Sequence, residues 1–495
     1  MKDLRHLSFL ILCCLLATFS SCDDDGISVI APAPHSGQGQ GHIPETKPVK
    51  PNENIEWDYP AAEWDKAGII LMHTPGEELF EGVIHPSAGL FEHYFDVDKA
   101  AEEHKHYIEM LQKNGIEVHT VIDILGEVEI EKLRELVKKV LVYDISNIED
   151  EDEEESEAYR QETIQEMSRN DLIRCLLIQP TVTLYKTDNN TGYEAEYTNY
   201  PLMNLYFTRD QSITTPRGHI ICNMNSLQRA PEVEIIKLCY EHLGKKVVMQ
   251  INGDGRLEGG DYIPAGTKAF IGMGMRTNIQ GIRQMLDADA FGHDTVVVVK
   301  DHKLWQMQMH LDTHFNIIDK DLCTMVSSRL YAQPGDPEYD TCDIYARAKG
   351  AKDYSLIRED VPFVDYLKDK GFEIIPIDYD DEMHYANNFL TIAPRHIMAV
   401  GGQSEELQQR FRDAGVTVEW IPLESLIEGY GAAHCMTQVL QREAYNPTTD
   451  IRKVSYPLAS RKGGANEATY RLDGIVADET TQGIVISNQK KIIRR

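Results

Sequence analysis

The chain carries, at residues 205–210, the stretch Leu205-Tyr206-Phe207-Thr208-Arg209-Asp210, in which β-forming side chains lead directly into an arginine and an aspartate. Such side chains favour extended backbone, so the stretch predicts a strand that ends at Asp210. Active-site groups often gather at strand ends in α/β proteins, although an Arg-Asp pair there is more often a structural ion pair. Asp210 is therefore a candidate site residue that needs support from other parts of the chain.

Two short motifs downstream supply that support. Glu258-Gly259-Gly260-Asp261 holds two adjacent glycines, which predict a tight turn and a close approach of the backbone to a neighbouring group. His310-Leu311-Asp312 places its histidine and its aspartate on one face if the segment is a strand. Each motif alone has an ordinary structural explanation, as a surface turn or as a core histidine.

The fourth motif, His434-Cys435-Met436-Thr437, follows a loop of small residues at 429–433 and precedes a helical pattern at 438–443. A cysteine near the start of a helix has a lowered thiol pKa, because the helix dipole stabilises the thiolate. We therefore expect Cys435 to be a reactive thiol, although a single cysteine is more often buried and inert. A protonated His434 beside it could hold a thiolate or a carboxylate by charge.

The four motifs together predict a site that binds and modifies a guanidinium group. A guanidinium is a planar, permanently charged fork that paired carboxylates bind with two hydrogen bonds each. Its central carbon needs a strong nucleophile, which a thiolate supplies at neutral pH. A histidine beside a carboxylate can then move the protons.

The overall charge agrees with a cationic substrate. The 495 residues include 80 acidic and 49 basic side chains, which gives a formal net charge of -31. This charge disfavours nucleic acid and anionic membrane surfaces as partners. Much of it lies in the acidic run at 149–155, which we expect to be a solvated loop.

The N-terminal residues predict an exported lipoprotein. Two basic residues precede an apolar run at 7–17, which is too short to span a bilayer but suits a signal peptide. The following Phe19-Ser20-Ser21-Cys22 resembles a bacterial lipobox, in which Cys22 is lipidated. We therefore expect a signal peptide at 1–22 and a disordered tether at 23–56. The mature protein would be membrane-anchored, in the periplasm or at the cell surface, with the lipid as its only membrane attachment.

From residue 57 onward, short apolar runs alternate with helical patterns, which predicts an α/β fold. We expect strands at 68–72, 218–222, 269–273, 295–299, 389–393 and 396–400. Helical patterns occupy 98–114, 130–142 and 405–414, the last ending at Gly415. The range 98–175 is almost wholly helical in pattern and predicts a helical insertion. The C-terminal extension at 448–495 has no assigned role, with candidate strands at 455–457 and 483–487.

These residues resemble the arginine deiminase family of the guanidine-modifying superfamily over most of 57–447. The similarity is carried by residues 66–79, 204–210, 271–277, 387–390 and 435–437. The resemblance implies a five-bladed, pseudo-symmetric α/β propeller with a helical insertion, and neither a metal nor an organic cofactor.

The resemblance also implies a role for each site residue. Cys435 would be the nucleophile and His310 the general acid and base, supported by Glu258, while Asp210 and Asp312 grip the guanidinium. The residues expected at the amino-acid end of the substrate, or in positioning it, are Asn204, Arg229, Arg276, Asp261 and His434.

The function that follows is hydrolysis of free L-arginine to L-citrulline and ammonia through a covalent thiouronium on Cys435. Agmatine or peptidyl-arginine is the alternative substrate, and Arg229 and Arg276 are the features that favour a free α-carboxylate. Less favoured alternatives are an amidinotransferase and a non-catalytic arginine-binding lipoprotein. A binding protein would not need Cys435, His310 and Glu258 together. The sequence leaves open whether the protein forms a homo-oligomer.

Overall fold

The computed structural model describes residues 62–148, 153–348 and 351–444, together with the short C-terminal strands β21 Tyr470–Arg471, β22 Gly483–Ser487 and β23 Lys490–Arg494. The strand predicted at 483–487 is therefore confirmed. The predicted signal peptide, the tether and the strand at 455–457 lie outside the described residues. Within the described ranges, no helix combines the length and apolar character that a membrane crossing requires.

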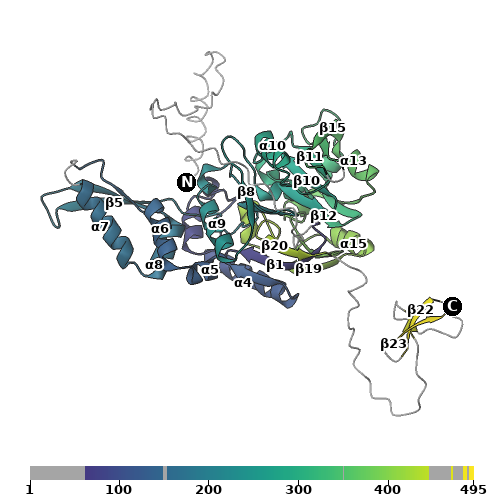
Figure 1. Ribbon diagram of the computed structural model, residues 1–495, viewed down its shortest axis with the longest axis horizontal. Helices are drawn as coiled ribbons and strands as arrows, with labels where there is room; N and C mark the ends of the chain where they lie inside the picture. Colours follow the sequence, from purple (N-terminus) through teal and green to yellow (C-terminus); the bar gives the residue numbers. More distant parts are fainter. Residues whose placement is uncertain are drawn as a thin grey trace, which may run out of the picture. The chain divides into compact units, whose positions relative to one another are not determined.

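Five sheets between Lys66 and Glu443 repeat one arrangement, and Figure 1 labels many of their strands. In each of the five, a central strand pairs antiparallel with one neighbour and parallel with a later strand that is reached through a helix. The sheets, in chain order of their middle strands, are β20 Gln438–Glu443, β1 Lys66–Met72 and β2 Glu117–Thr120; β6 Ser212–Thr215, β7 Gly218–Ile221 and β8 Val247–Gln250; β9 Tyr262–Ala265, β10 Lys268–Met273 and β11 Thr295–Lys300; β12 Phe315–Asp319, β13 Leu322–Val326 and β16 Glu373–Ile377; β17 Leu390–Ala393, β18 His396–Val400 and β19 Thr417–Ile421.

A helix lies between the two parallel strands of every sheet, because parallel neighbours need a long crossover. These helices are α4 Val97–Lys113, α9 Glu232–His242, α10 Ile279–Asp287, α13 Phe363–Asp369 and α15 Glu405–Asp413. The third sheet is extended by β14 Thr341–Ala346 and β15 Ser355–Pro362. The first sheet takes its antiparallel strand, β20, from the far end of the described core. The predicted α/β class is confirmed, as are the six listed strands and the helix that ends at Gly415, whose φ is +67°.

Two local predictions are wrong. Residues 205–210 form turns instead of a strand, with the backbone N–H of Phe207 donating to the carbonyl of Asn204, and β6 begins only at Ser212. Leu205, Tyr206 and Phe207 are all buried, which a strand with one solvated face would not allow. Residues 438–443 form β20 instead of a helix, because they pair with β1.

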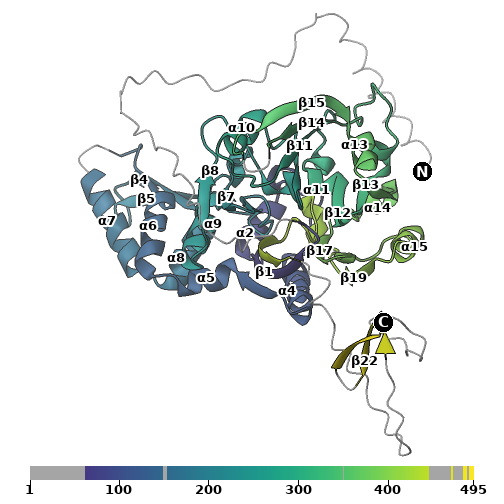
Figure 2. The same cartoon turned by 45° about the vertical axis from the view of Figure 1, so that its right-hand side comes forward.

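The predicted helical insertion contains helices and also strands. The predicted range holds α5 Val121–Glu127, α6 Ile130–Val140, α7 Glu153–Glu166, most of α8 Arg169–Ile178 and the strand β3 Val142–Asp144. Beyond the predicted range, β4 Pro180–Lys186 and β5 Tyr193–Asn199 complete a sheet with β3 (Figure 2). At the start of the predicted range, α4 and β2 belong to the first sheet, since β2 pairs with β1. Part of the acidic run, Glu153 to Glu155, forms the first turn of α7, where the helix dipole favours negative charge.

Candidate active site

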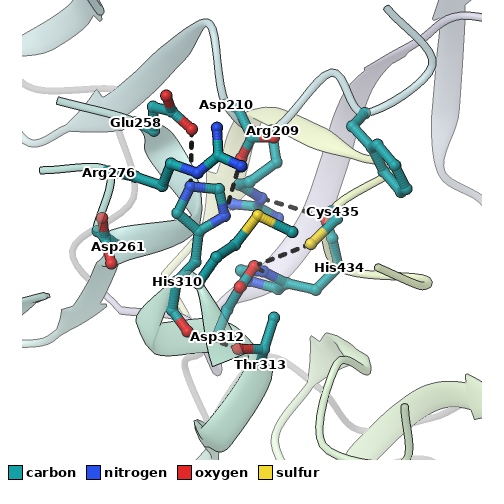
Figure 3. Close-up of polar contacts among 12 residues, drawn as sticks. Arg209, Asp210, Glu258, Asp261, Arg276, His310, Asp312, Thr313, His434 and Cys435 are labelled. Atoms are coloured by element: carbon teal, nitrogen blue, oxygen red, sulfur yellow. Dashed lines mark hydrogen bonds and ion pairs between the residues drawn. The ribbon is translucent and has the colours of Figure 1, made fainter. Parts of the chain in front are cut away.

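The motif residues come together because each precedes the antiparallel edge strand of its sheet. Asp210 precedes β6, Glu258 precedes β9, and His310 and Asp312 precede β12. Cys435 precedes β20 in the same way. These five residues are at most 3% exposed, and Figure 3 shows Glu258 and Asp210 near His310 and Asp312 near Cys435. The repeated β-β-α-β unit therefore explains why motifs far apart in the sequence meet.

His310 lies between two carboxylates. Its Nε2 is 2.9 Å from Oε2 of Glu258, and its Nδ1 is 3.6 Å from Oδ1 of Asp210. Burial would lower the pKa of His310, but Asp210 and the hydrogen bond with Glu258 raise it to about 9. Burial would likewise raise the pKa of Glu258, but the hydrogen bond with His310 and the charge of Arg276 lower it to about 2. The pair suits proton transfer, because the ring is held in one orientation.

The two glycines of the second motif are needed for this packing. A β-carbon on Gly260 would lie 2.7 Å from Nδ1 of His310, and one on Gly259 would lie 1.9 Å from the carbonyl oxygen of Arg209. The predicted tight turn is confirmed as a 3-10 turn over Gly259–Asp261.

Asp261 holds the next motif in place. Its Oδ1 accepts a hydrogen bond of 3.0 Å from the backbone N–H of Leu311, between His310 and Asp312. Burial raises the pKa of Asp261 to about 6. His310 and Asp312 do not lie on a strand as expected, since His310 is the N-cap of the short helix α11 Leu311–His314. Their side chains diverge, with His310 near Glu258 and Asp312 near Cys435 (Figure 3).

Cys435 is buried against a carboxylate, and its Sγ is 3.5 Å from Oδ2 of Asp312. Burial, followed by the charges of Asp312 and Asp210, raises the pKa of the Cys435 thiol well above its usual range. The expectation of a pKa lowered by a helix start is therefore wrong, because a strand follows the motif. The free site favours the neutral thiol, and a bound cation would offset the two carboxylates.

Asn388, Arg209 and Arg442 are buried polar residues that sequence reasoning left out of the site. Oδ1 of Asn388 accepts hydrogen bonds from the backbone N–H groups of Cys435, at 3.1 Å, and Ala432, at 2.9 Å. Arg209 donates from Nε to the carbonyl of His434 at 3.2 Å, so it holds the nucleophile loop instead of pairing with Asp210. Asn388 lies directly before β17, and this position in the repeat was the signal that could have found it.

The two candidate carboxylate-binding arginines are in different situations. Nη1 of Arg229 is 2.6 Å from Oδ2 of Asp210, and Nη2 is 2.9 Å from Oε2 of Glu232, so its charge is already paired. Nη2 of Arg276 donates to Oε1 of Gln306 at 3.2 Å, whereas its buried Nε has no hydrogen-bond partner. Arg276 is the cation with donor capacity left for a ligand.

A cavity of about 20 Å³ lies in front of Cys435. It is lined by Leu90, Asn204, Phe207, Asp210, Arg229, Arg276, Gln306, Met309, His310, Gly429, Tyr430 and Cys435. Leu90 and Tyr430 have left-handed backbone, with φ of +64° and +65°. Glu258, Asp261, Asp312 and His434 lie outside this lining, and the ring of His434 is fully buried beside Asp312.

Among the residues that the structure describes, one group of side chains has metal-ligand spacing. Single ligand atoms of Asp210, Glu258 and His310 lie within 4.8 Å of one another, all buried. Arg229 already donates to Asp210, and the charge of Arg276 stabilises the Glu258 carboxylate. Two arginines therefore already offset the charge of these carboxylates. The cluster fits a planar organic cation at least as well as a metal ion.

A buried thiol, a histidine between two carboxylates and a third carboxylate beside the thiol define a cysteine-dependent enzyme for guanidinium compounds. The chain belongs to the arginine deiminase family, whose model matches residues 88–442. The arginine deiminase of Halobacterium salinarum is 28% identical over 478 residues, covering 77% of this chain and 96% of that protein. That of Metamycoplasma arthritidis is 25% identical, covering 76% and 94%.

Among solved structures, the dimethylarginine dimethylaminohydrolase of Pseudomonas aeruginosa with citrulline covers 75% of this chain and 99% of its own. It shares 18% identity, with a TM-score of 0.46.

Proposed function

We propose that the protein hydrolyses free L-arginine to L-citrulline and ammonia, with Cys435 as the nucleophile. One observation carries this function. Oδ1 of Asp210, Oδ1 of Asp312 and Nδ1 of His310 are buried without a hydrogen-bond partner, and all three residues lie around Cys435. Oδ1 of Asp210 faces Nδ1 of His310 at 3.6 Å, which is too long for a hydrogen bond. The two acceptors therefore lack hydrogen bonds at one place beside a proton carrier, and a guanidinium would supply the missing donors.

The reaction would proceed in two halves. The Cys435 thiol loses its proton to solvent as the cation binds, and the thiolate Sγ attacks the guanidinium carbon. Protonated His310 then gives its proton to the departing nitrogen, and ammonia leaves. A thiouronium then links Cys435 to the substrate. In the second half His310 takes a proton from water as that water attacks the same carbon, the C–S bond breaks, and the ureido group of citrulline remains.

The thiol would be activated by the substrate itself. Asp312 and Asp210 oppose formation of a thiolate in the free site. A guanidinium bound between these carboxylates brings a positive charge that compensates them, so the thiolate forms where its target already lies. This order keeps the thiol protonated, and so less open to oxidation, until a cation binds.

Arg276 supports free arginine over agmatine, because its unpaired donor suits an α-carboxylate, which agmatine lacks. The test is to incubate purified protein with arginine, agmatine and an arginine-containing peptide, and to measure both ureido product and ammonia. Ureido product and equal ammonia from arginine alone would support the proposal. Faster turnover of agmatine or peptide would overturn the substrate, and amidine transfer without ammonia would overturn the reaction.

The five-bladed, pseudo-symmetric propeller remains part of this proposal. It is supported by five β-β-α-β sheets in the described core and by the pairing of β20 with β1, which would close a ring. An experimental structure in which the five sheets do not surround one axis would overturn it.

Export as a lipid-anchored protein is likewise proposed. It is supported by the basic and apolar residues before Cys22 and by Phe19-Ser20-Ser21-Cys22 itself.

A further inference from the structure

The ring of His434 lies between two carboxylates. Its Nδ1 is 2.6 Å from Oδ2 of Asp312, and its Nε2 is 3.4 Å from Oε1 of Glu63. His434 and Asp312 are 0% exposed and Glu63 is 1% exposed. Glu63 precedes β1 and lies before the range that the family model matches.

Both carboxylates are held in the charged form. Burial would raise the pKa of Asp312, but the contact with His434 lowers it. Burial would also raise the pKa of Glu63, but the charge of Arg442 and the contact with His434 lower it to about 2. Arg442 is itself fixed by donating to the carbonyls of Asp65, at 2.8 Å, and Thr391, at 2.6 Å.

The two carboxylate oxygens of Asp312 have different surroundings. Oδ2 is shared by His434 and by Sγ of Cys435, at 2.6 Å and 3.5 Å. Oδ1 is buried and has no hydrogen-bond partner. A carboxylate anchored through one oxygen has little freedom to rotate, so its second oxygen stays directed towards one place.

We propose that Glu63 and His434 are positioning residues for Asp312, forming a relay in which Glu63 orients His434 and His434 fixes Oδ2 of Asp312. The relay would keep Oδ1 of Asp312 available for the guanidinium. It would also draw the charge of Oδ2 away from the thiol of Cys435. The inference rests on the proposed arginine hydrolysis for its effect on turnover, but not for its effect on the thiol.

Glu63→Gln tests the relay through the direction in which the pH profile of Cys435 alkylation moves. Removing a negative charge by itself would make the Cys435 thiol easier to ionise. Weakening the His434 contact would instead leave Asp312 facing the thiol and make it harder to ionise. We expect the pH profile of Cys435 alkylation by iodoacetamide to move to higher pH, and kcat/KM for arginine to fall roughly 10- to 100-fold.

Two further variants separate positioning from folding. His434→Gln keeps the Glu63–Arg442 ion pair. A glutamine amide has both of its N–H donors on one nitrogen, so it cannot bridge carboxylates that lie at opposite ring nitrogens of His434. It should move the alkylation profile in the same direction. Glu78→Gln is a matched control, because Glu78 is buried and its Oε1 is 2.9 Å from Nε2 of His73, outside the site cavity. It should lower thermal stability without moving the profile.

The double variant Glu63→Gln/His434→Gln completes a cycle. Residues that act in one relay give non-additive losses, so the double variant should lose little more than the worse single variant. Additive losses, or an alkylation profile that Glu63→Gln leaves unchanged or moves to lower pH, would overturn the relay. Absence of arginine turnover in the unmodified protein would overturn the proposed function and leave the thiol test standing.

Discussion

Gly260 lies so close to the ring of His310 that a β-carbon at residue 260 would stand 2.7 Å from Nδ1. The backbone of the turn forms one wall of the histidine site, and Glu258 in the same turn bonds the other ring nitrogen. One turn thus sets both the position and the partner of the proposed proton carrier.

Gly260→Ala should therefore reduce activity more than stability. The added methyl group meets a side chain, which can move by displacing the His310 ring from Glu258, so kcat should fall by at least about tenfold. Gly259→Ala is the comparison, because its methyl group would meet the backbone carbonyl of Arg209, which cannot move as easily. Gly259→Ala should lower the melting temperature more than Gly260→Ala. Equal activities for Gly260→Ala and the wild type would show that the contact between residue 260 and the His310 ring does not matter for catalysis.

Cys435→Ala should abolish formation of citrulline, with more than a thousandfold loss in kcat, because the covalent route needs the thiol. Cys239→Ala is a suitable control, since Cys239 is fully buried in α9, away from the site. Acid quenching during turnover, followed by mass spectrometry, should show arginine less one ammonia attached to Cys435. An adduct on another residue, or retained turnover in Cys435→Ala, would contradict the assignment.

Arg276→Ala should lower kcat/KM for arginine. The expected loss corresponds to roughly 2–4 kcal/mol of transition-state stabilisation, as for the loss of one partner of a buried charge pair. Agmatine turnover, if measurable, should hardly change. Arg229→Ala should behave differently, because Arg229 neutralises Asp210 and Glu232. It should lower stability and reduce turnover of both substrates alike. Steady-state kinetics on both substrates decides, and equal losses for Arg276→Ala would argue against a carboxylate contact.

The Glu258–His310 pair should make stability depend on pH. The pKa of His310 is about 9 in the folded protein, against about 6.5 for an unperturbed histidine. Its contribution is therefore fully present below about pH 6.5 and is lost as the pH rises through 9. In Glu258→Gln the pKa of His310 should fall towards its ordinary value, because one of the groups that raise it is gone. Denaturant unfolding should thus show an advantage of the wild type over Glu258→Gln that shrinks between pH 6.5 and pH 9. A constant or growing advantage would contradict the charge assignment.

Cys22→Ala should release the protein from the membrane fraction, because a lipid on Cys22 would be its only anchor. A fatty-acid probe fed to cells should label the wild type and not this variant. Failure to label the wild type would exclude the lipoprotein assignment while leaving the enzymatic proposal intact.

The sequence predicted which motifs belong together, because their chemistry is local: carboxylates, a histidine and a thiol in fixed order. It could not predict how each motif is held. Residues 438–443 form a strand because they pair with β1 at the opposite end of the core, and no local pattern contains that partner. Likewise, Arg229 looks like a ligand-binding cation until its contact with Glu232 places it in an internal ion pair.

The roles of Asn388 and Glu63 depend on three-dimensional proximity for the same reason. Asn388 accepts from the backbone of Cys435, and Glu63 approaches His434 from a segment ahead of β1. Neither residue lies in one of the four motifs, and a contact between distant segments cannot be read from a local sequence pattern. Asn388 lies in the stretch 387–390 that carries the family resemblance, and its position before an edge strand links it with the motif residues.

The cavity of about 20 Å³ in front of Cys435 has room for about one water molecule. An arginine side chain is larger than this space, so we expect the site to widen when substrate binds. Leu90 and Tyr430 border the cavity, and both have left-handed backbone, which is uncommon for such residues. We expect the backbone to change conformation at these two residues when the site widens. The apparent affinity for arginine then includes the fraction of molecules that are open. Changes at these two residues would alter how fast substrate enters and product leaves, while the chemical step on Cys435 stays the same.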